Sequence, residues 1–277
     1  MANATYTLEQ YNKTKFEKEI ETCLEIDKVV LPLVHKANYR RASSFFLSKE
    51  ITPVMCDVFS ENVEYTFVGR PAYYVHSDPQ SENYPVCFVI NTKENLLENI
   101  FVFDTGAYAN NMYDKFLENP SQDINVYRIP ASTKSVNQMI KRFFSSNRNY
   151  YLSKVNTTIN NATPDSEIKS YINLLRIDFE DDSPGFDDRC RTIENVFRNP
   201  ISLEENLQAV ILSFSQSRTK EFKKFISSFE RNVEIVTYDT FDITPNEGNQ
   251  AINGLLYTYL ERHGYFTDES EKGGCAT

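Results

Sequence analysis

The sequence predicts one α/β domain in which helices flank a mixed β-sheet. Short apolar runs rich in β-branched and aromatic residues cluster within the first hundred residues and again after residue 190. Segments with helical spacing lie before, between and after these runs. No Pro-, Gly- or Ser-rich linker divides the chain, so we expect residues 1–266 to form a single domain, followed by a flexible polar tail over 267–277.

The predicted strands are short and bounded by turn residues. They cover residues 29–34, 63–68, 73–76, 85–90, 99–103, 192–197, 207–214 and 233–238. The runs 192–197 and 207–214 show little alternation between apolar and polar residues, which predicts strands buried on both faces.

The predicted helices are amphipathic. They cover residues 7–24, 38–50, 134–144, 164–177, 222–229 and 251–263. In the second of these, Ala42, Phe45 and Phe46 fall on one side, as expected for a helix that packs on a sheet. Gly264 follows the last helix and is its expected left-handed cap. The acidic stretch 180–188 is broken by Pro184-Gly185 and predicts a loop.

Composition excludes several classes of protein. The 277 residues include 29 Lys and Arg, 39 Asp and Glu and only 8 Gly, for a net charge of −10. Neither a G-x-G-x-x-G nor a G-x-x-x-x-G-K-[ST] motif occurs, which excludes a Rossmann or P-loop phosphate cradle. No apolar run approaches the ~20 residues that span a bilayer. The five scattered cysteines form no C-x-x-C pair, so we expect reduced thiols, no structural zinc and a cytoplasmic location.

Three strings at predicted strand ends favour a functional site. They are Gly69-Arg70-Pro71-Ala72-Tyr73, the segment 103–108 around Asp104-Thr105-Gly106, and the charged segment 187–194 that ends in Glu194. Each string can be a plain turn, because Pro and Gly set backbone dihedrals and Asp caps its own backbone. Their common place at strand ends, where side chains enter a cleft, favours function instead.

The order of these features resembles the ADP-ribosyltransferase fold, and within it the DNA-modifying ADP-ribosyltransferase toxins. The resemblance rests on a strand that ends in Val34-His35, a helix start at Asn38-Tyr39, the 69–73 string, and a late strand that carries Glu194. It implies a split, mixed sheet, NAD as the substrate, and nucleic acid or protein as the acceptor, in a bacterial or phage conflict system. An NAD site of this type needs no Gly-rich loop.

The resemblance also implies catalytic roles for individual residues. Glu194 would hold the ribose 2′-hydroxyl and stabilise the positive charge that develops as nicotinamide leaves. His35 would hydrogen-bond the adenosine ribose. Tyr73 or Tyr74 would stack on the nicotinamide ring.

The pyrophosphate of NAD would need a cation. The resemblance gives this role to Arg70, or to one of Arg40 and Arg41, because a planar guanidinium fits phosphate oxygens. Asp104 has no counterpart in the resemblance, and we add it as a further cofactor contact.

Other interpretations of the sequence stay open. The helix 134–144 and the residues after it carry Lys134, Lys141, Arg142 and Arg148, which could meet an acceptor or simply face water. The 20 Phe and 17 Tyr suit a non-catalytic binding or assembly protein of the same fold equally well. A metal-dependent nuclease or hydrolase built on Asp104 and nearby acids is the third alternative.

Overall fold

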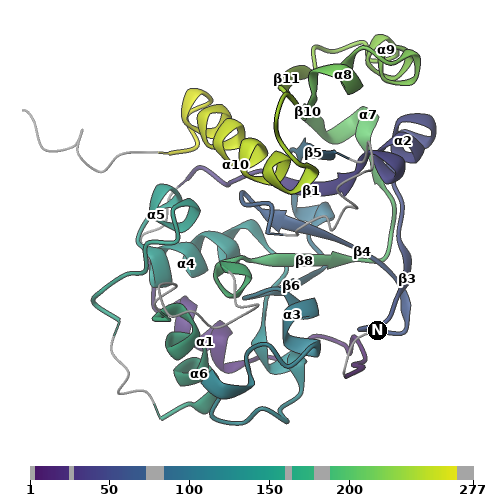
Figure 1. The fold of residues 1–277 in the computed structure, drawn as a ribbon. Helices are drawn as coiled ribbons and strands as arrows, with labels where there is room; N and C mark the ends of the chain where they lie inside the picture. The colour runs from purple at the N-terminus through teal and green to yellow at the C-terminus, as the bar shows by residue number, and fades with distance from the viewer. Residues whose placement is uncertain (1–3, 25–27, 73–83, 160–163, 178–187, 267–277) are drawn as a thin grey trace, which may run out of the picture.

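The computed structural model describes residues 4–24, 28–72, 84–159, 164–177 and 188–266. The predicted strand 73–76, all but the last residue of the predicted loop 180–188, and the tail 267–277 lie outside these ranges. In the described residues the chain is a mixed α/β protein built around one large sheet (Figure 1).

The strands are short, as predicted. They are β1 (Leu33–Asn38), β2 (Glu50–Ile51), β3 (Val54–Cys56), β4 (Glu61–Val68), β5 (Pro85–Ile90), β6 (Asn99–Phe101), β7 (Arg128–Ile129), β8 (Glu194–Phe197), β9 (Ile201–Ser202), β10 (Leu207–Ser213) and β11 (Glu234–Tyr238). The main sheet has the order β11-β10-β5-β1-β4-β8-β6-β7, with β3 added beside β4. Only β10 and β11 pair in parallel among these strands, and the other pairs are antiparallel, so the prediction of a mixed sheet is confirmed.

The sheet is weakly joined between β1 and β4. All six residues of β1 pair with β5, whereas only Leu33 and Val34 pair with β4. From His35 onward the two strands therefore diverge. Beyond this point the His35 side chain still contacts the β4 backbone: its Nδ1 lies 2.7 Å from the carbonyl oxygen of Tyr65. The sheet is continuous between β1 and β4 only through the start of β1.

Helices cover both halves. They are α1 (Lys15–Glu21), α2 (Tyr39–Ser48), α3 (Thr105–Ala109), α4 (Thr133–Phe144), α5 (Asn147–Tyr151), α6 (Ser166–Leu175), α7 (Leu203–Asn206), α8 (Phe214–Ser217), α9 (Lys220–Ser227) and α10 (Pro245–Arg262). In the half that contains β5, α2 and α9 pack together through Phe46, Phe222 and Phe225, and α10 packs on β5, β10 and β11. Helices α1, α4 and α6 gather by the other half (Figure 1). Their core contains Phe16, Phe143 and Tyr171.

Element boundaries differ from the sequence prediction where capping decides them. The strand predicted over 29–34 lies at 33–38, because Asn38 ends it by accepting a hydrogen bond from the Arg41 N–H at 2.8 Å and so starts α2. The first helix begins only after its cap Thr14 and covers 15–21 rather than 7–24. The last begins at Pro245, six residues earlier than predicted, behind a capping box of Thr244 and Glu247.

Candidate functional site

A cavity of about 530 Å³ opens where β1 and β4 separate. This is a common size for a small-molecule site. Residues from β1, α2, β3, β4, α3 and β8 line it. They are His35, Lys36, Ala37, Asn38, Arg41, Val54, Cys56, Val58, Glu64, Tyr65, Phe67, Asp104, Gly106, Asn110, Arg189 and Glu194. The cavity therefore lies at the weak junction of the sheet.

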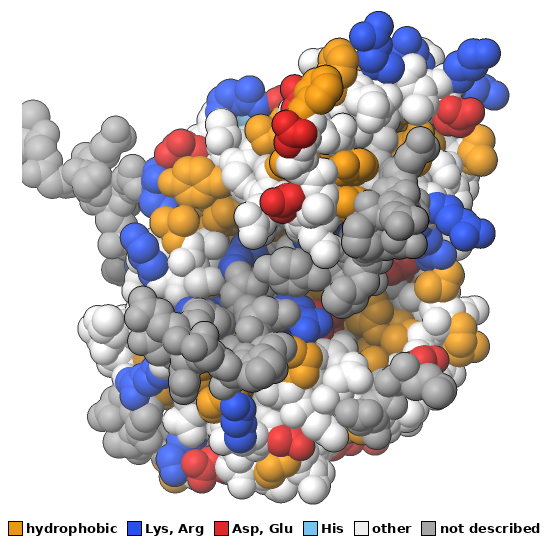
Figure 2. Space-filling view, in the orientation of Figure 1, with side chains coloured by type: hydrophobic (Ala, Val, Ile, Leu, Met, Phe, Trp, Pro, Cys, Tyr) orange, Lys and Arg blue, Asp and Glu red, His pale blue; other side chains and the backbone are white. Residues whose placement is uncertain are grey.

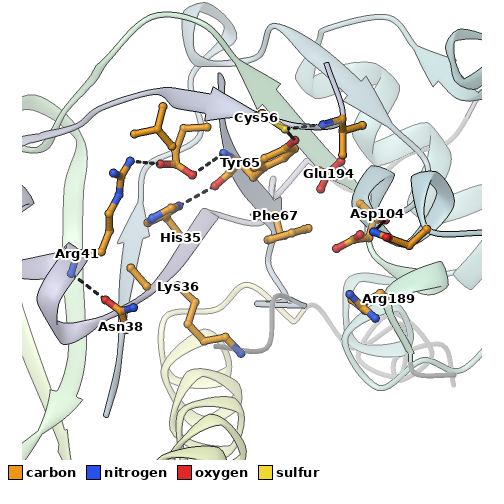
Figure 3. Close-up of a pocket in the computed structure, with 16 residues that line it drawn as sticks. His35, Lys36, Asn38, Arg41, Cys56, Tyr65, Phe67, Asp104, Arg189 and Glu194 are labelled. Atoms are coloured by element: carbon orange, nitrogen blue, oxygen red, sulfur yellow. Dashed lines mark hydrogen bonds and ion pairs between the residues drawn. The ribbon is translucent and has the colours of Figure 1, made fainter. Parts of the chain in front are cut away.

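Three neighbouring strands deliver the central side chains of this cavity. His35 comes from β1, Tyr65 from β4 and Glu194 from β8 (Figure 3). Glu194 lies opposite Phe67 in the β4–β8 ladder, and Tyr65 is two residues away from Phe67, so both project from the same face of the sheet. The sheet order β1-β4-β8 is what brings residues 35, 65 and 194 together.

The carboxyl group of Glu194 is held inside the protein. Glu194 is 2% exposed, and the backbone N–H of Thr105 donates a hydrogen bond to its Oε2 at 3.0 Å. Burial raises the pKa of Glu194 well above its usual range, and the neighbouring Asp104 raises it further. The hydrogen bonding of Thr105 and the charge of Arg189 oppose this shift only in part. Glu194 thus holds its proton more tightly than an ordinary glutamate.

Asp104 stands at the same wall and starts α3. Its Oδ1 accepts a hydrogen bond from the Ala107 N–H at 2.6 Å, and its own N–H donates to the Arg189 carbonyl at 3.3 Å. A Cβ at Gly106 would lie 3.2 Å from the Asp104 Oδ1, tighter than most such contacts. The Asp104-Thr105-Gly106 turn therefore does two things: it presents the N–H of Thr105 to Glu194 and fixes a second carboxyl beside it.

Lys36 is the unexpected residue of the cavity. It is 3% exposed, and its Nζ donates to the Pro71 carbonyl oxygen at 3.2 Å. Burial lowers its pKa from 10.5 to about 7, an effect that Cys87 on the adjacent strand weakly opposes. The amine can therefore change its charge near neutral pH.

Arg41 and Glu64 form the outer wall. Nη2 of Arg41 lies 2.7 Å from Oε2 of Glu64 and also donates to the Thr52 carbonyl oxygen at 2.8 Å. Further in, the hydroxyl of Tyr65 lies 2.7 Å from Sγ of Cys56, and burial raises the pKa of this tyrosine far above its usual value. Tyr65 is accordingly a neutral hydroxyl and a flat ring at the cavity wall.

The structure gathers some of the sequence-predicted residues and separates others. His35, Asp104, Glu194 and Arg41 all line the cavity. Arg70 does not line it; its Nη1 donates to Oγ of Ser153 at 2.6 Å.

Arg40 also fails to line the cavity, because it is exposed on the outer side of α2. Tyr73 and Tyr74 lie outside the described residues. Sequence reasoning missed Lys36, Glu64, Tyr65 and Arg189. The one signal for Lys36 was a lysine within an apolar strand, directly after His35.

No protein-family model, curated protein or solved structure matches the chain. Within the described ranges, no helix has the length and apolar character to cross a membrane. Over the same part of the chain, no three His, Cys, Asp or Glu side chains are grouped so that they could hold a metal ion.

Proposed function

We propose that the protein cleaves the bond between nicotinamide and ribose in NAD and transfers ADP-ribose to an acceptor. One observation carries the proposal: His35, Tyr65 and Glu194, on three adjacent strands, line one cavity, and the carboxyl group of Glu194 is buried and hydrogen-bonded. The resemblance of the sequence to ADP-ribosyltransferases concerns two of these residues. The likeness of the fold to that family is part of the proposal, and the short β1–β4 junction, which splits the sheet, supports it.

The chemistry of this site fits the cleavage of an N-glycosidic bond. As nicotinamide leaves, positive charge develops at C1″ of the ribose, and carboxyl groups at a buried wall stabilise such charge. Burial and mutual repulsion disfavour the state in which Glu194 and Asp104 are both ionised, so the pair carries less than two negative charges. Glu194, in its protonated form, is also a hydrogen-bond donor to a ribose hydroxyl.

His35 is suited to contact the adenosine ribose. Its Nδ1 lies 2.7 Å from a carbonyl oxygen, which can only accept, so Nδ1 carries the proton. In the neutral ring, Nε2 is then an acceptor for a ribose hydroxyl. Tyr65 and Phe67 offer ring surface in the same cavity, while the proposed stacking of Tyr73 or Tyr74 concerns residues outside the described ranges.

Of the three arginines first expected to meet the pyrophosphate, only Arg41 lines the cavity. Arg41 and Arg189 line the cavity, whereas Arg70 and Arg40 do not. We therefore propose Arg41 as the residue that meets the pyrophosphate, since its guanidinium enters the cavity from α2 and Figure 3 places it on the side of His35.

The proposed acceptor is a macromolecule, either nucleic acid or protein. In α4 and α5, Arg142 and Arg148 pair with Glu19 and Glu261 at 2.6 and 3.1 Å, which compensates part of the basic face predicted there. A second group of exposed cations lies on and around α2 and α9. It consists of Arg40, Arg218, Lys220, Lys223 and Lys224.

The two helices that carry this second group are in contact. The Tyr39 hydroxyl, at the start of α2, donates to Oγ1 of Thr219, the cap of α9, at 2.9 Å. Figure 2 shows Lys and Arg side chains gathered over this upper part of the molecule. The basic surface supports an anionic acceptor that approaches from this side. The cytoplasmic location and the role in a conflict system are parts of the same proposal.

A nicotinamide-release assay tests the proposal. Purified protein is incubated with millimolar NAD, and free nicotinamide is measured for the wild type, Glu194→Gln and the control Glu50→Gln, which changes an exposed carboxylate on β2. We expect release by the wild type and the control, and its loss in Glu194→Gln. Tight NAD binding without release by the wild type would favour the non-catalytic alternative. The absence of both binding and release would exclude the NAD proposal.

A further inference from the structure

We propose that Asp104 is the general base that takes the proton from the acceptor as ADP-ribose is transferred. This inference rests on the proposed function and assigns a role to a residue that the resemblance leaves unexplained. It concerns which carboxyl group at the shared wall accepts a proton and which one contacts the ribose.

The geometry gives the two carboxyl groups different surroundings. Glu194 sits at the start of β8 and is 2% exposed; Asp104 sits in the turn before α3 and is 5% exposed. Both line the same cavity, and Figure 3 shows them at one wall with Arg189 beside them. A ligand atom that lies against Glu194 is therefore next to Asp104.

A hydrogen bond fixes the carboxyl group of Asp104. Its Oδ1 accepts the short bond from the Ala107 N–H, which sets the direction of the carboxyl group at the cavity wall. Burial and the charge of Asp104 favour the protonated form of Glu194. Glu194 is thereby suited to donate to a ribose hydroxyl, which leaves Asp104 as the carboxyl group at this wall that can take a proton.

The other titratable groups of the cavity are less suited to the task. Glu64 is engaged by Arg41, and Nδ1 of His35 is bound to the Tyr65 carbonyl oxygen. Tyr65 holds its proton, since burial raises its pKa. The amine of Lys36 is engaged as well, since its Nζ donates to the Pro71 carbonyl oxygen. Arg189, as a guanidinium, stays protonated and offers the two carboxyl groups a counter-charge.

The proposed step conserves atoms and electrons. The C1″–N bond breaks and its electron pair leaves with nicotinamide. A lone pair of the acceptor oxygen or nitrogen forms the new bond to C1″. The proton of that acceptor atom passes to the carboxylate of Asp104 and later to solvent. With water as the acceptor, the products are nicotinamide and free ADP-ribose.

The test compares Asp104→Asn with Glu194→Gln in NAD hydrolysis, with water as the acceptor. Asparagine keeps the oxygen that caps Ala107, so α3 should be retained. The control is Asp123→Asn, since the Asp123 carboxyl group also caps a helical turn, Ile124–Tyr127, and does not line the cavity. We expect Asp104→Asn to hydrolyse NAD about 10²- to 10⁴-fold more slowly than wild type and to lose the acidic limb of the pH profile, while NAD affinity is retained.

Azide then separates a base from a structural residue. Azide attacks C1″ without giving up a proton, so it should restore nicotinamide release in Asp104→Asn and should not do so in Glu194→Gln. Wild-type rates and pH profile in Asp104→Asn would overturn the inference, as would a slow variant that azide does not restore. If Glu194→Gln also releases nicotinamide at the wild-type rate, the proposed function itself fails.

Discussion

The backbone N–H of Thr105 and the Oε2 atom of Glu194 are joined by a hydrogen bond of 3.0 Å, although 89 residues separate them in the chain. The bond links the first residue of α3 to the first residue of β8. It is the contact through which the turn after β6 supports the carboxyl group that we propose as the centre of the reaction.

This bond can be removed without disturbing α3. Thr105 is the first residue of the helix, where proline is well tolerated because its missing N–H has no partner within the helix. In Thr105→Pro, Glu194 loses its donor and we expect nicotinamide release to fall by about fivefold, since a hydrogen bond between uncharged groups contributes about 1 kcal/mol.

The control for this change is Thr105→Ser, which keeps both the N–H and the hydroxyl. We expect it to retain release within about threefold of wild type. Unchanged release in Thr105→Pro, with α-helical content and thermal stability retained, would show that the bond does not support catalysis.

The strands and the burial of this site could be predicted from the sequence because they depend on local pattern. The runs around Val196 and Val210 lack alternation, and both strands are buried on both faces as predicted. His35 and Glu194 were singled out through the resemblance to ADP-ribosyltransferases, which places them beside the predicted strand 29–34 and within the predicted strand 192–197. Their convergence could not be predicted, since it depends on the order β1-β4-β8, and a single sequence does not encode strand order in any local signal.

Physical reasons explain why sequence reasoning missed some residues of the cavity. Lys36 was missed because the predicted strand ended at residue 34, whereas β1 continues to Asn38, and because lysine is rarely buried. Tyr65 is one of 17 tyrosines and carries no distinguishing local pattern. Arg41 and Arg40 are adjacent, and only the phase of α2, set by its cap Asn38, decides which guanidinium enters the cavity.

The different positions of Arg41 and Arg40 on α2 predict different effects on NAD affinity, and Arg40 serves as the control. Arg41 lines the cavity and Arg40, one residue earlier, is exposed on the same helix. We expect Arg41→Ala to weaken NAD binding by about tenfold or more, which corresponds to a charge-assisted bond of about 1.4 kcal/mol or more. Arg40→Ala should bind NAD as the wild type does, and isothermal titration measures both.

An equal loss of affinity in the two variants would mean that Arg41 acts through overall charge and not through contact. Because Arg41 also pairs with Glu64, the titration is repeated with Glu64→Gln. This variant keeps the guanidinium and should retain most of the affinity.

Glu194 should reduce stability at neutral pH. Its folded-state pKa is raised, so between its unfolded pKa near 4.5 and the higher folded value the native protein holds one proton more than the unfolded chain. The free energy of unfolding therefore falls as pH rises through this window. In Glu194→Gln no ionisable group is buried at this position, and we expect the variant to be more stable than the wild type at pH 8.

The gain in Glu194→Gln should shrink as pH falls toward 4.5, because the wild-type carboxyl then becomes protonated in both states. Urea unfolding at about pH 5 and about pH 8 measures both values. A variant less stable than the wild type at the higher pH would contradict the expected destabilisation by the buried carboxyl. Together with lost nicotinamide release, a gain would mark Glu194 as a residue kept for function at the expense of stability.

Lys36 should show a different dependence on pH. Its folded-state pKa is lowered to about 7 from 10.5, so between these values the unfolded chain binds a proton that the folded protein does not. Stability therefore rises with pH through this window, and the cost of burying the amine is fully present below pH 7. We expect Lys36→Met to be more stable than wild type at pH 6.5, by as much as about 5 kcal/mol, with the difference falling toward pH 10.

Lys220→Met, which changes an exposed lysine on α9, is the control and should leave the stability within about 0.5 kcal/mol at each pH. A loss of stability in Lys36→Met at pH 6.5 would mean that contacts made by the amine outweigh its burial.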